Sequence, residues 1–263
     1  MRLTKHHGLG NDFLVLLDPS GMQPFGPDLA RAVCDRHRGI GADGLLRLGP
    51  GRDGAALSMV LLNADGGRAE MSGNGISCLV QAAVLAGLAA APLVTVATDA
   101  GMRTVRIEPT AEARTHRVTV DMGAAKVGDD ETEWLDDEII RALRVDVGNP
   151  HLVLHAPDLD WGYDLVARGE EINELVPGGI NVEIVAAGPG EDELTMRVYE
   201  RGVGLTEACG TGACAVAAAA VSWGIAGPQV RVHQPGGTAA ISVGDTITMT
   251  VPVAHVATIE WLG

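Results

Sequence analysis

A cysteine, a glycine-rich turn and a run of small residues follow one another in Glu207-Ala208-Cys209-Gly210-Thr211-Gly212-Ala213-Cys214 and in residues 215–221 behind it. This pattern predicts a helix that begins at the turn. The first turn of a helix has unpaired N–H groups and a partial positive charge, which favours a thiolate or a carboxylate there. We therefore expect Cys209 to have a depressed pKa and to lie beside an anion site. A buried helix that merely follows a cysteine fits this single segment equally well.

A second copy of the segment lies 137 residues earlier. Glu70-Met71-Ser72-Gly73-Asn74-Gly75 aligns with Glu207-Ala208-Cys209-Gly210-Thr211-Gly212, and Gly87 aligns with Gly224 near each expected helix end. Further upstream, Gly10-Asn11-Asp12-Phe13-Leu14-Val15-Leu16 resembles Gly148-Asn149-Pro150-His151-Leu152-Val153-Leu154. A repeated pattern of this kind predicts two similar domains that present their helix starts to one cleft. The copies differ at one position, because Ser72 stands where Cys209 stands.

The composition is that of a globular protein. Of 263 residues, 46% are hydrophobic and 20% charged, and 35 glycines indicate many turns and strand ends. The net charge of −15 argues against nucleic acid and anionic membranes as partners, since both need clustered Lys and Arg.

The cellular context follows from what the sequence lacks. No stretch is long and apolar enough to span a bilayer, and the N-terminal residues have no signal-peptide core, so we expect a cytoplasmic protein. Four cysteines in a chain of this length predict no disulfide framework. The spacing of Cys209 and Cys214, with no histidine cluster nearby, predicts no metal site.

Periodicity predicts many strands and one principal helix in each half. The expected helices cover 27–36, 75–87, 163–174 and 209–224, and the expected strands cover 3–17 with a turn at Asn11-Asp12, 45–48, 57–62, 93–98, 102–108, 117–122, 152–154, 182–186, 194–199, 230–232, 238–243, 246–251 and 255–262. This predicts an α+β fold in which a curved, mainly antiparallel sheet wraps a central helix in each half.

The polar and acidic segment 123–133 is a candidate linker or long loop. We therefore expect an N-terminal domain over 1–118 and a C-terminal domain over 119–253, with a final strand at 254–263 returning to the first domain.

Two side chains on opposite faces of a tetrahedral carbon suit a racemase that works without a cofactor. One group takes the α-proton and the other returns a proton from the opposite side. Ser72 and Cys209 are the candidate pair. Because an α-proton is very weakly acidic, backbone N–H groups on the substrate carboxylate must stabilise the transition state.

Several motifs together resemble the diaminopimelate epimerase family. They are His7-Gly8-Leu9-Gly10-Asn11-Asp12-Phe13, Asn63-Ala64-Asp65-Gly66, Gly73-Asn74-Gly75, Gly148-Asn149-Pro150-His151, Asn181-Val182-Glu183, Glu200-Arg201-Gly202 and Cys209-Gly210-Thr211-Gly212. The resemblance runs in order along the whole chain. It implies two pseudo-symmetric barrel-like domains with the active site in the cleft between them, and a homodimer. It also implies interconversion of LL- and meso-2,6-diaminopimelate, on the route to lysine and the bacterial cell wall, with neither pyridoxal phosphate nor a metal.

The resemblance also implies a role for each matching residue. Cys209 matches one catalytic thiol, Ser72 occupies the place of the other, and His151 and Glu200 match groups beside the reacting carbon. The substrate carboxylate cradles match Gly73, Asn74, Gly210 and Thr211, and the groups that hold the distal end of the substrate match Asn11, Asn63, Asn149, Asn181, Glu200 and Arg201.

Ser72 and Gly44 depart from the family pattern. A serine hydroxyl is far less acidic than a thiol and needs a partner base, so we expect the chain to bind substrate and to turn it over poorly. Three explanations stay open for Ser72: an engineered substitution, a natural change with a slower or different reaction, or loss of catalysis. Gly44 replaces a side chain that reaches the substrate in some members, so distal recognition is expected to differ. The alternatives to the epimerase are a racemase of another amino acid and a binding protein without chemistry.

Overall fold

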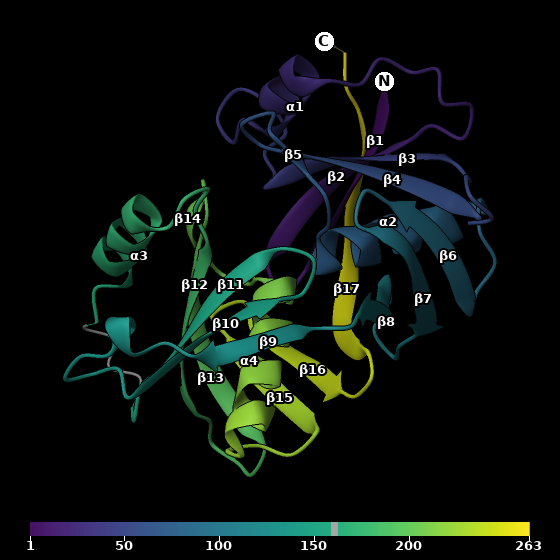
Figure 1. Ribbon diagram of the computed structural model, residues 1–263. Helices are drawn as coiled ribbons and strands as arrows, with labels where there is room; N and C mark the ends of the chain where they lie inside the picture. The colour runs from purple at the N-terminus through teal and green to yellow at the C-terminus, as the bar shows by residue number, and fades with distance from the viewer. Residues whose placement is uncertain (159–162, 263) are drawn as a thin grey trace. The chain divides into compact units, whose positions relative to one another are not determined.

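The computed structural model describes residues 1–158 and 163–262, and it forms two compact units (Figure 1). The N-terminal unit comprises Met1–Asp121 and Thr250–Gly263, and the C-terminal unit comprises Met122–Met249. The last strand of the chain therefore belongs largely to the first unit.

The strands of the N-terminal unit pair in a closed ring. They are β1 (Arg2–Gly8), β2 (Asn11–Leu17), β3 (Gly44–Pro50), β4 (Leu57–Asn63), β6 (Leu93–Thr98), β7 (Gly101–Pro109), β8 (Thr115–Gly123) and β17 (Ile247–Glu260), with the short β5 (Arg68–Ala69) on β4. Each pairs with the next in this order, and β17 pairs back onto β1. The β2–β3 and β4–β6 pairs are parallel, and the other pairs with a defined register are antiparallel.

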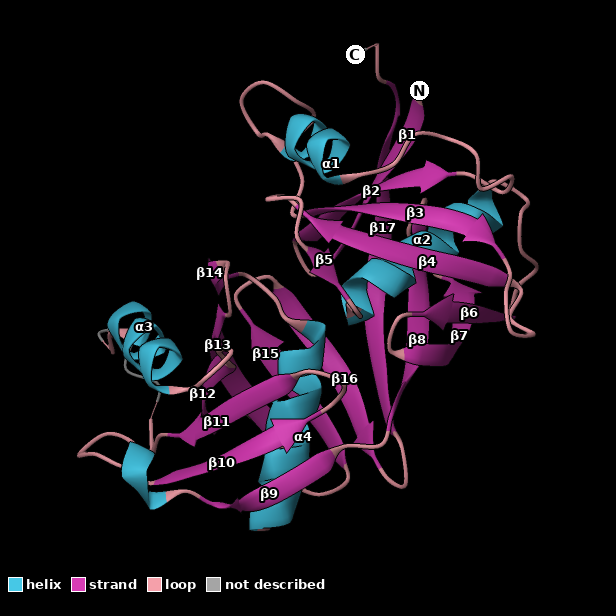
Figure 2. Ribbon diagram, turned by 45° about the horizontal axis from the view of Figure 1, so that its top comes forward, coloured by secondary structure: helices cyan, strands magenta, loops and turns pink. Residues whose placement is uncertain are grey.

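The helix α2 (Gly73–Leu85) fills this ring and packs against β1, β2, β3, β4 and β7 (Figure 2). Its residues from Gly73 to Ala83 are all buried, as expected of a helix that is surrounded by a sheet. The shorter α1 (Pro27–Cys34) packs against β3 and β4 through Ala30 and Val33.

The C-terminal unit repeats the plan. Its strands pair in the order β9 (Lys126–Asp130), β10 (Arg141–Asp146), β11 (Pro150–His155), β12 (Asn181–Ala187), β13 (Glu193–Glu200), β15 (Gln229–Gln234) and β16 (Gly237–Val243), and β14 (Gly204–Thr206) adds to β13. They pack around α4 (Gly210–Trp223), which is buried from Gly210 to Ala220. The helix α3 (Leu165–Leu175) packs on β12 and β13, and a 3-10 turn covers Thr132–Trp134.

The two central helices match at both ends. Each begins after a residue whose side chain accepts a hydrogen bond from the backbone N–H three residues later. Ser72 accepts from Gly75, and Cys209 accepts from Gly212. Each ends in a left-handed glycine, Gly87 at φ 70° and Gly224 at φ 72°. The closing hydrogen bonds also correspond, Leu88 N–H to Ala83 O in one unit and Ile225 N–H to Ala220 O in the other. The fold class predicted from the repeat is confirmed.

Two local expectations were wrong. The segment 123–133 holds β9 and the 3-10 turn, where a linker or long loop was expected. Although β9 is exposed and polar, it pairs with β10, and Asp130 accepts from Arg141 (2.9 Å) and from the indole N–H of Trp223 (2.8 Å). The strands expected at 246–251 and 255–262 are one continuous strand, β17. Pro252 lies within β17 at an exposed position, where a missing N–H donor is tolerated.

None of the helices in the described part of the chain is long and apolar enough to cross a membrane.

Candidate functional site

Cys209 caps the N-terminus of α4. Its Sγ accepts a hydrogen bond from the Gly212 amide at 3.3 Å and lies 3.4 Å from the Thr211 hydroxyl. Its own amide donates to Oε1 of Gln234 on β15 at 2.7 Å, and the residue is 6% exposed. Gly210 and Thr211 are buried beside it in the first helical turn, where backbone N–H groups have no intrahelical acceptor.

The expectation of a depressed pKa for Cys209 is wrong for this structure. Burial raises the pKa of the thiol, and the nearby carboxylates of Glu200 and Glu183 raise it further. The hydrogen bonds from Thr211 and Gly212 lower it, but they are the smaller effects. The helix N-terminus thus does not by itself compensate for a dry site that contains two negative charges.

His151 lies on β11, on the first residue pair of the parallel β11–β12 ladder, opposite Asn181. Its ring is fully buried, with Nδ1 2.7 Å from Oε1 of Glu183 and Nε2 3.0 Å from Oδ1 of Asn149. The Asn149 amide nitrogen donates in turn to Thr211 Oγ1 at 3.4 Å. His151, Asn149, Thr211 and Cys209 are therefore joined by hydrogen bonds within the C-terminal unit.

Glu183 is the residue that sequence reasoning missed. It lies in the motif Asn181-Val182-Glu183, and a carboxylate inside the apolar strand β12 is itself a signal of a functional role. The residue is 0% exposed, and its Oε2 is buried with no hydrogen-bond partner in the described part of the chain.

The distal-end candidates of the C-terminal unit lie at the ends of β12 and β13. The side-chain oxygen of Asn181 accepts from the Arg201 amide at 2.9 Å, and the Arg201 guanidinium donates to the Gly178 carbonyl at 3.0 Å. Glu200 ends β13 and accepts from the Thr206 hydroxyl at 2.5 Å. Arg201 is exposed, whereas Asn181 is buried.

In the N-terminal unit, Ser72 holds the place that Cys209 holds in the other. Its Oγ accepts a hydrogen bond from the Gly75 amide at 3.0 Å. Its side chain makes no other hydrogen bond to the described residues. Gly73 and Asn74 follow it in the first turn of α2 and are buried.

Asn11 and Asn74 contact each other beside that helix start. The Asn74 amide donates to Oδ1 of Asn11 at 3.3 Å, and the Asn11 amide donates to Asp43 at 2.7 Å. Asn63 ends β4 opposite Gly44 and closes a turn with Gly67. The predicted residues of this unit are therefore gathered at the ends of β2 and β4 and at the start of α2.

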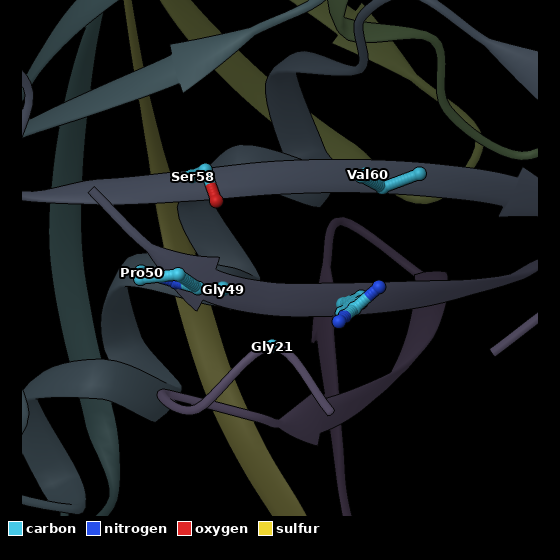
Figure 3. A pocket seen from close by; sticks show the side chains of 6 residues that line it. Gly21, Gly49, Pro50, Ser58 and Val60 are labelled. Carbon is cyan, nitrogen blue, oxygen red and sulfur yellow. The ribbon is translucent and has the colours of Figure 1, made fainter. Parts of the chain in front are cut away.

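A separate pocket of about 260 Å³ lies in the N-terminal unit and contains none of the predicted site residues (Figure 3). Its lining residues are Gly21, Arg47, Gly49, Pro50, Ser58 and Val60. The guanidinium of Arg47 already pairs with the buried Asp18 at 2.8 Å, so its charge is neutralised within the protein.

Comparison with known proteins identifies the family. The family model described as diaminopimelate epimerase matches residues 3–128 and 143–256. The diaminopimelate epimerase of Desulforudis audaxviator is 39% identical over 100% of this chain and 99% of the relative. That of Corynebacterium glutamicum is 37% identical over 97% of this chain and 95% of the relative.

Solved structures show the same fold at lower identity. A hydroxyproline epimerase from Agrobacterium vitis, with bound trans-4-OH-L-proline, superposes with a TM-score of 0.76 at 18% identity, over 98% of this chain and 91% of that one. A probable proline racemase from Agrobacterium radiobacter gives a TM-score of 0.75 at 20% identity, over 99% and 92%. The match of the family model across both units, together with relatives of full length, places this chain in the diaminopimelate epimerase family.

Proposed function

We propose that this protein binds 2,6-diaminopimelate and interconverts its LL and meso isomers by two-base proton transfer, slowly because of Ser72. The observation that carries the proposal is the buried thiol of Cys209 at the start of α4, within a family match that covers both units. The two central helices start in the same way, which supports equivalent roles for Ser72 and Cys209 at the two bases.

The C-terminal unit supplies the group that we assign as the active base. The Cys209 thiolate takes the α-proton, and the electron pair left on the carbon spreads into the adjacent carboxylate. The first-turn amides of Gly210 and Thr211 stabilise the charge that develops there, because a fixed donor in a dry site needs no reorganisation. A proton returned from the opposite side completes the inversion.

Ser72 weakens the second half of that exchange. To return a proton, its hydroxyl would become an alkoxide, which is far less stable than a thiolate. A serine base needs a neighbouring base to accept its proton. Among the described residues, Ser72 Oγ accepts a hydrogen bond from the Gly75 amide. An amide N–H is a donor, so this contact supplies no base for the hydroxyl proton.

Substrate selection rests on the polar residues at the strand ends. Asn11, Asn63, Asn149, Asn181, Glu200 and Arg201 are all present in this chain. A small amino acid has no second amino and carboxyl group for the distal ones among these residues to bind, so it would gain no hydrogen bonds from them. Their retention therefore favours diaminopimelate over a simple amino acid.

The same proposal covers the setting of the reaction. A cytoplasmic homodimer that needs neither pyridoxal phosphate nor a metal fits the family and the acidic composition. We propose the two compact units as the two domains of that family.

The test is NMR of LL- and meso-diaminopimelate in D2O with the native chain, Ser72→Cys and Cys209→Ala. We expect Ser72→Cys to epimerise both isomers, the native chain to be slow or to exchange deuterium into one isomer only, and Cys209→Ala to be inactive. If neither the native chain nor Ser72→Cys exchanges an α-proton, the diaminopimelate epimerase assignment fails. Titration calorimetry with diaminopimelate and with proline then separates a binding protein from a racemase of another amino acid.

A further inference from the structure

A continuous line of polar groups connects a buried carboxylate to the sulfur of Cys209. Glu183 Oε1 lies 2.7 Å from His151 Nδ1, and His151 Nε2 lies 3.0 Å from Asn149 Oδ1. Asn149 Nδ2 lies 3.4 Å from Thr211 Oγ1, which lies 3.4 Å from Cys209 Sγ. Glu183 and His151 are both fully buried, so bulk water does not compete for the contact between them, whereas Asn149 is half-buried.

The donors of this line can all point towards the sulfur. His151 Nε2 faces the Asn149 oxygen, so this contact forms in the ring state whose Nε2 carries a hydrogen and donates it. Asn149 then donates through its nitrogen to Thr211, and the single hydroxyl hydrogen of Thr211 is left for the sulfur. A sulfur that receives a hydrogen bond is favoured as the thiolate over the thiol.

The N-terminal unit has no such line. In its parallel β2–β3 pair, Phe13 stands opposite Gly44, as His151 stands opposite Asn181 in β11–β12. Two residues further along, Leu46 therefore corresponds to Glu183.

Contacts at the matching helix glycines confirm the correspondence. A Cβ built on Gly75 meets Leu46 Cδ2 at 3.5 Å, and one built on Gly212 meets Glu183 Oε1 at 2.7 Å. The unit that keeps the thiol thus carries a buried Glu–His pair where the unit that carries Ser72 has a leucine and a phenylalanine.

We propose that Glu183 is a positioning residue that orients His151 and so directs the donors of Asn149 and Thr211 at the Cys209 sulfur, favouring the thiolate. The hydrogen-bonded line belongs to the C-terminal unit whatever the substrate. Only its use in proton abstraction rests on the proposed function.

Among the described residues, the carboxylates of Glu200 on β13 and Glu183 on β12 act on the Cys209 thiol directly. His151 on β11 reaches it through Asn149 and Thr211. Glu183 has two opposite effects there. Its negative charge disfavours the thiolate directly, whereas its hold on His151 favours the thiolate through the donors. When the carboxylate is replaced by an amide of the same size, loss of the charge would favour the Cys209 thiolate, whereas loss of the hold on His151 would disfavour it.

The test measures alkylation of Cys209 by iodoacetamide as a function of pH, followed by peptide mass spectrometry, in the native chain and in Glu183→Gln. If Glu183 acts through His151, the variant reacts about fivefold more slowly at neutral pH and its midpoint moves up by about one pH unit. Glu207→Gln is the matched control, because Glu207 is exposed and only two residues from Cys209. It should leave the profile unchanged.

Faster or unchanged alkylation in Glu183→Gln overturns the proposal, since it leaves only the direct charge effect or none. If that variant does not fold, ¹⁵N NMR of the His151 ring in the native chain decides instead, because an unprotonated Nε2 contradicts the donor direction. The alkylation result does not depend on turnover. Absence of α-proton exchange in Ser72→Cys would therefore defeat the proposed function and leave this proposal standing.

Discussion

Gly212 shows how closely the residues around Cys209 are packed. A Cβ at this position would lie 2.7 Å from Glu183 Oε1 and 3.3 Å from Cys209 Sγ. The Glu183 carboxylate is held by His151 in a fully buried position, so it cannot move aside without breaking that bond. The backbone is helical here, and the glycine is needed for space.

We therefore predict that Gly212→Ala destabilises the protein by about 1–3 kcal/mol, although Gly→Ala inside a helix ordinarily stabilises it. The measurement is the free energy of unfolding in urea. Gly244→Ala is the control, because a Cβ built at this exposed position meets only Thr246 O, at an ordinary contact distance of 3.6 Å, and it should change the stability by less than about 0.5 kcal/mol. Equal effects of the two substitutions would contradict the packing argument.

At the scale of single residues, the sequence predicts where Cys209 lies but not how deeply it is buried or which groups surround it. The pattern around Cys209 located the thiol at a helix start, and the structure confirms that placement. The predicted direction of its pKa was wrong, because the pattern showed neither the burial of the thiol nor the carboxylates of Glu200 and Glu183 that β13 and β12 bring beside it. A pKa depends on groups that are distant in sequence, and a local motif does not contain them.

The central helix α4 consists mainly of small side chains, and this limits the substitutions that it tolerates. Its alanines at 215 and 217–220 are all buried, and the strands of the C-terminal unit surround it. Small side chains let the sheet approach closely, and such a site has little room for added atoms.

We predict that Ala219→Leu destabilises the C-terminal unit by about 1–3 kcal/mol through overpacking. Ser222→Leu, on the same helix at an exposed position, should change the stability by less than about 0.5 kcal/mol. Hydrogen exchange should show faster opening of α4 in the first variant and unchanged protection of α2. A tolerated Ala219→Leu would mean that the sheet around α4 adapts.

At the scale of elements, the sequence predicted the principal helices and most strands because each has a clear period and ends in a turn or a glycine. It failed for β9, where pairing with β10 and the contacts of Asp130 decide the conformation of a polar segment. It divided β17 because a proline within a strand resembles a break. Both errors arise where long-range pairing outweighs local composition.

Across the whole molecule, stability depends on histidines that are buried without charge. His6 is fully buried, its Nδ1 pairs with Gln81 at 2.7 Å, and burial lowers its pKa from 6.5 to about 4. The unfolded chain therefore binds a proton near pH 6.5 that the folded chain does not accept until about pH 4. This contribution to stability is complete above pH 6.5 and is lost as the pH falls from 6.5 to about 4.

We predict that the unfolding free energy falls by about 3 kcal/mol over that range through His6. Asn at position 6 keeps a donor for Gln81 and does not titrate, so His6→Asn should flatten the urea-unfolding profile between pH 6.5 and 4.5. His37→Gln removes an exposed histidine and should leave the profile unchanged. An unaltered slope in His6→Asn would assign the acid sensitivity to other groups.

The strand β17 returns the chain to its start, and the amino group of Met1 donates to the carbonyl of Trp261 at 2.7 Å. A short peptide linking the two ends would therefore close the chain into a circle without disturbing β1 or β17. Opening that circle at the exposed turn Gly244–Asp245 would give a circular permutant that starts just before β17. In that permutant the N-terminal unit is read from one uninterrupted stretch of gene. The pairing of β17 with β1 holds this unit together, and the fold itself does not require that its two segments be separated in the sequence.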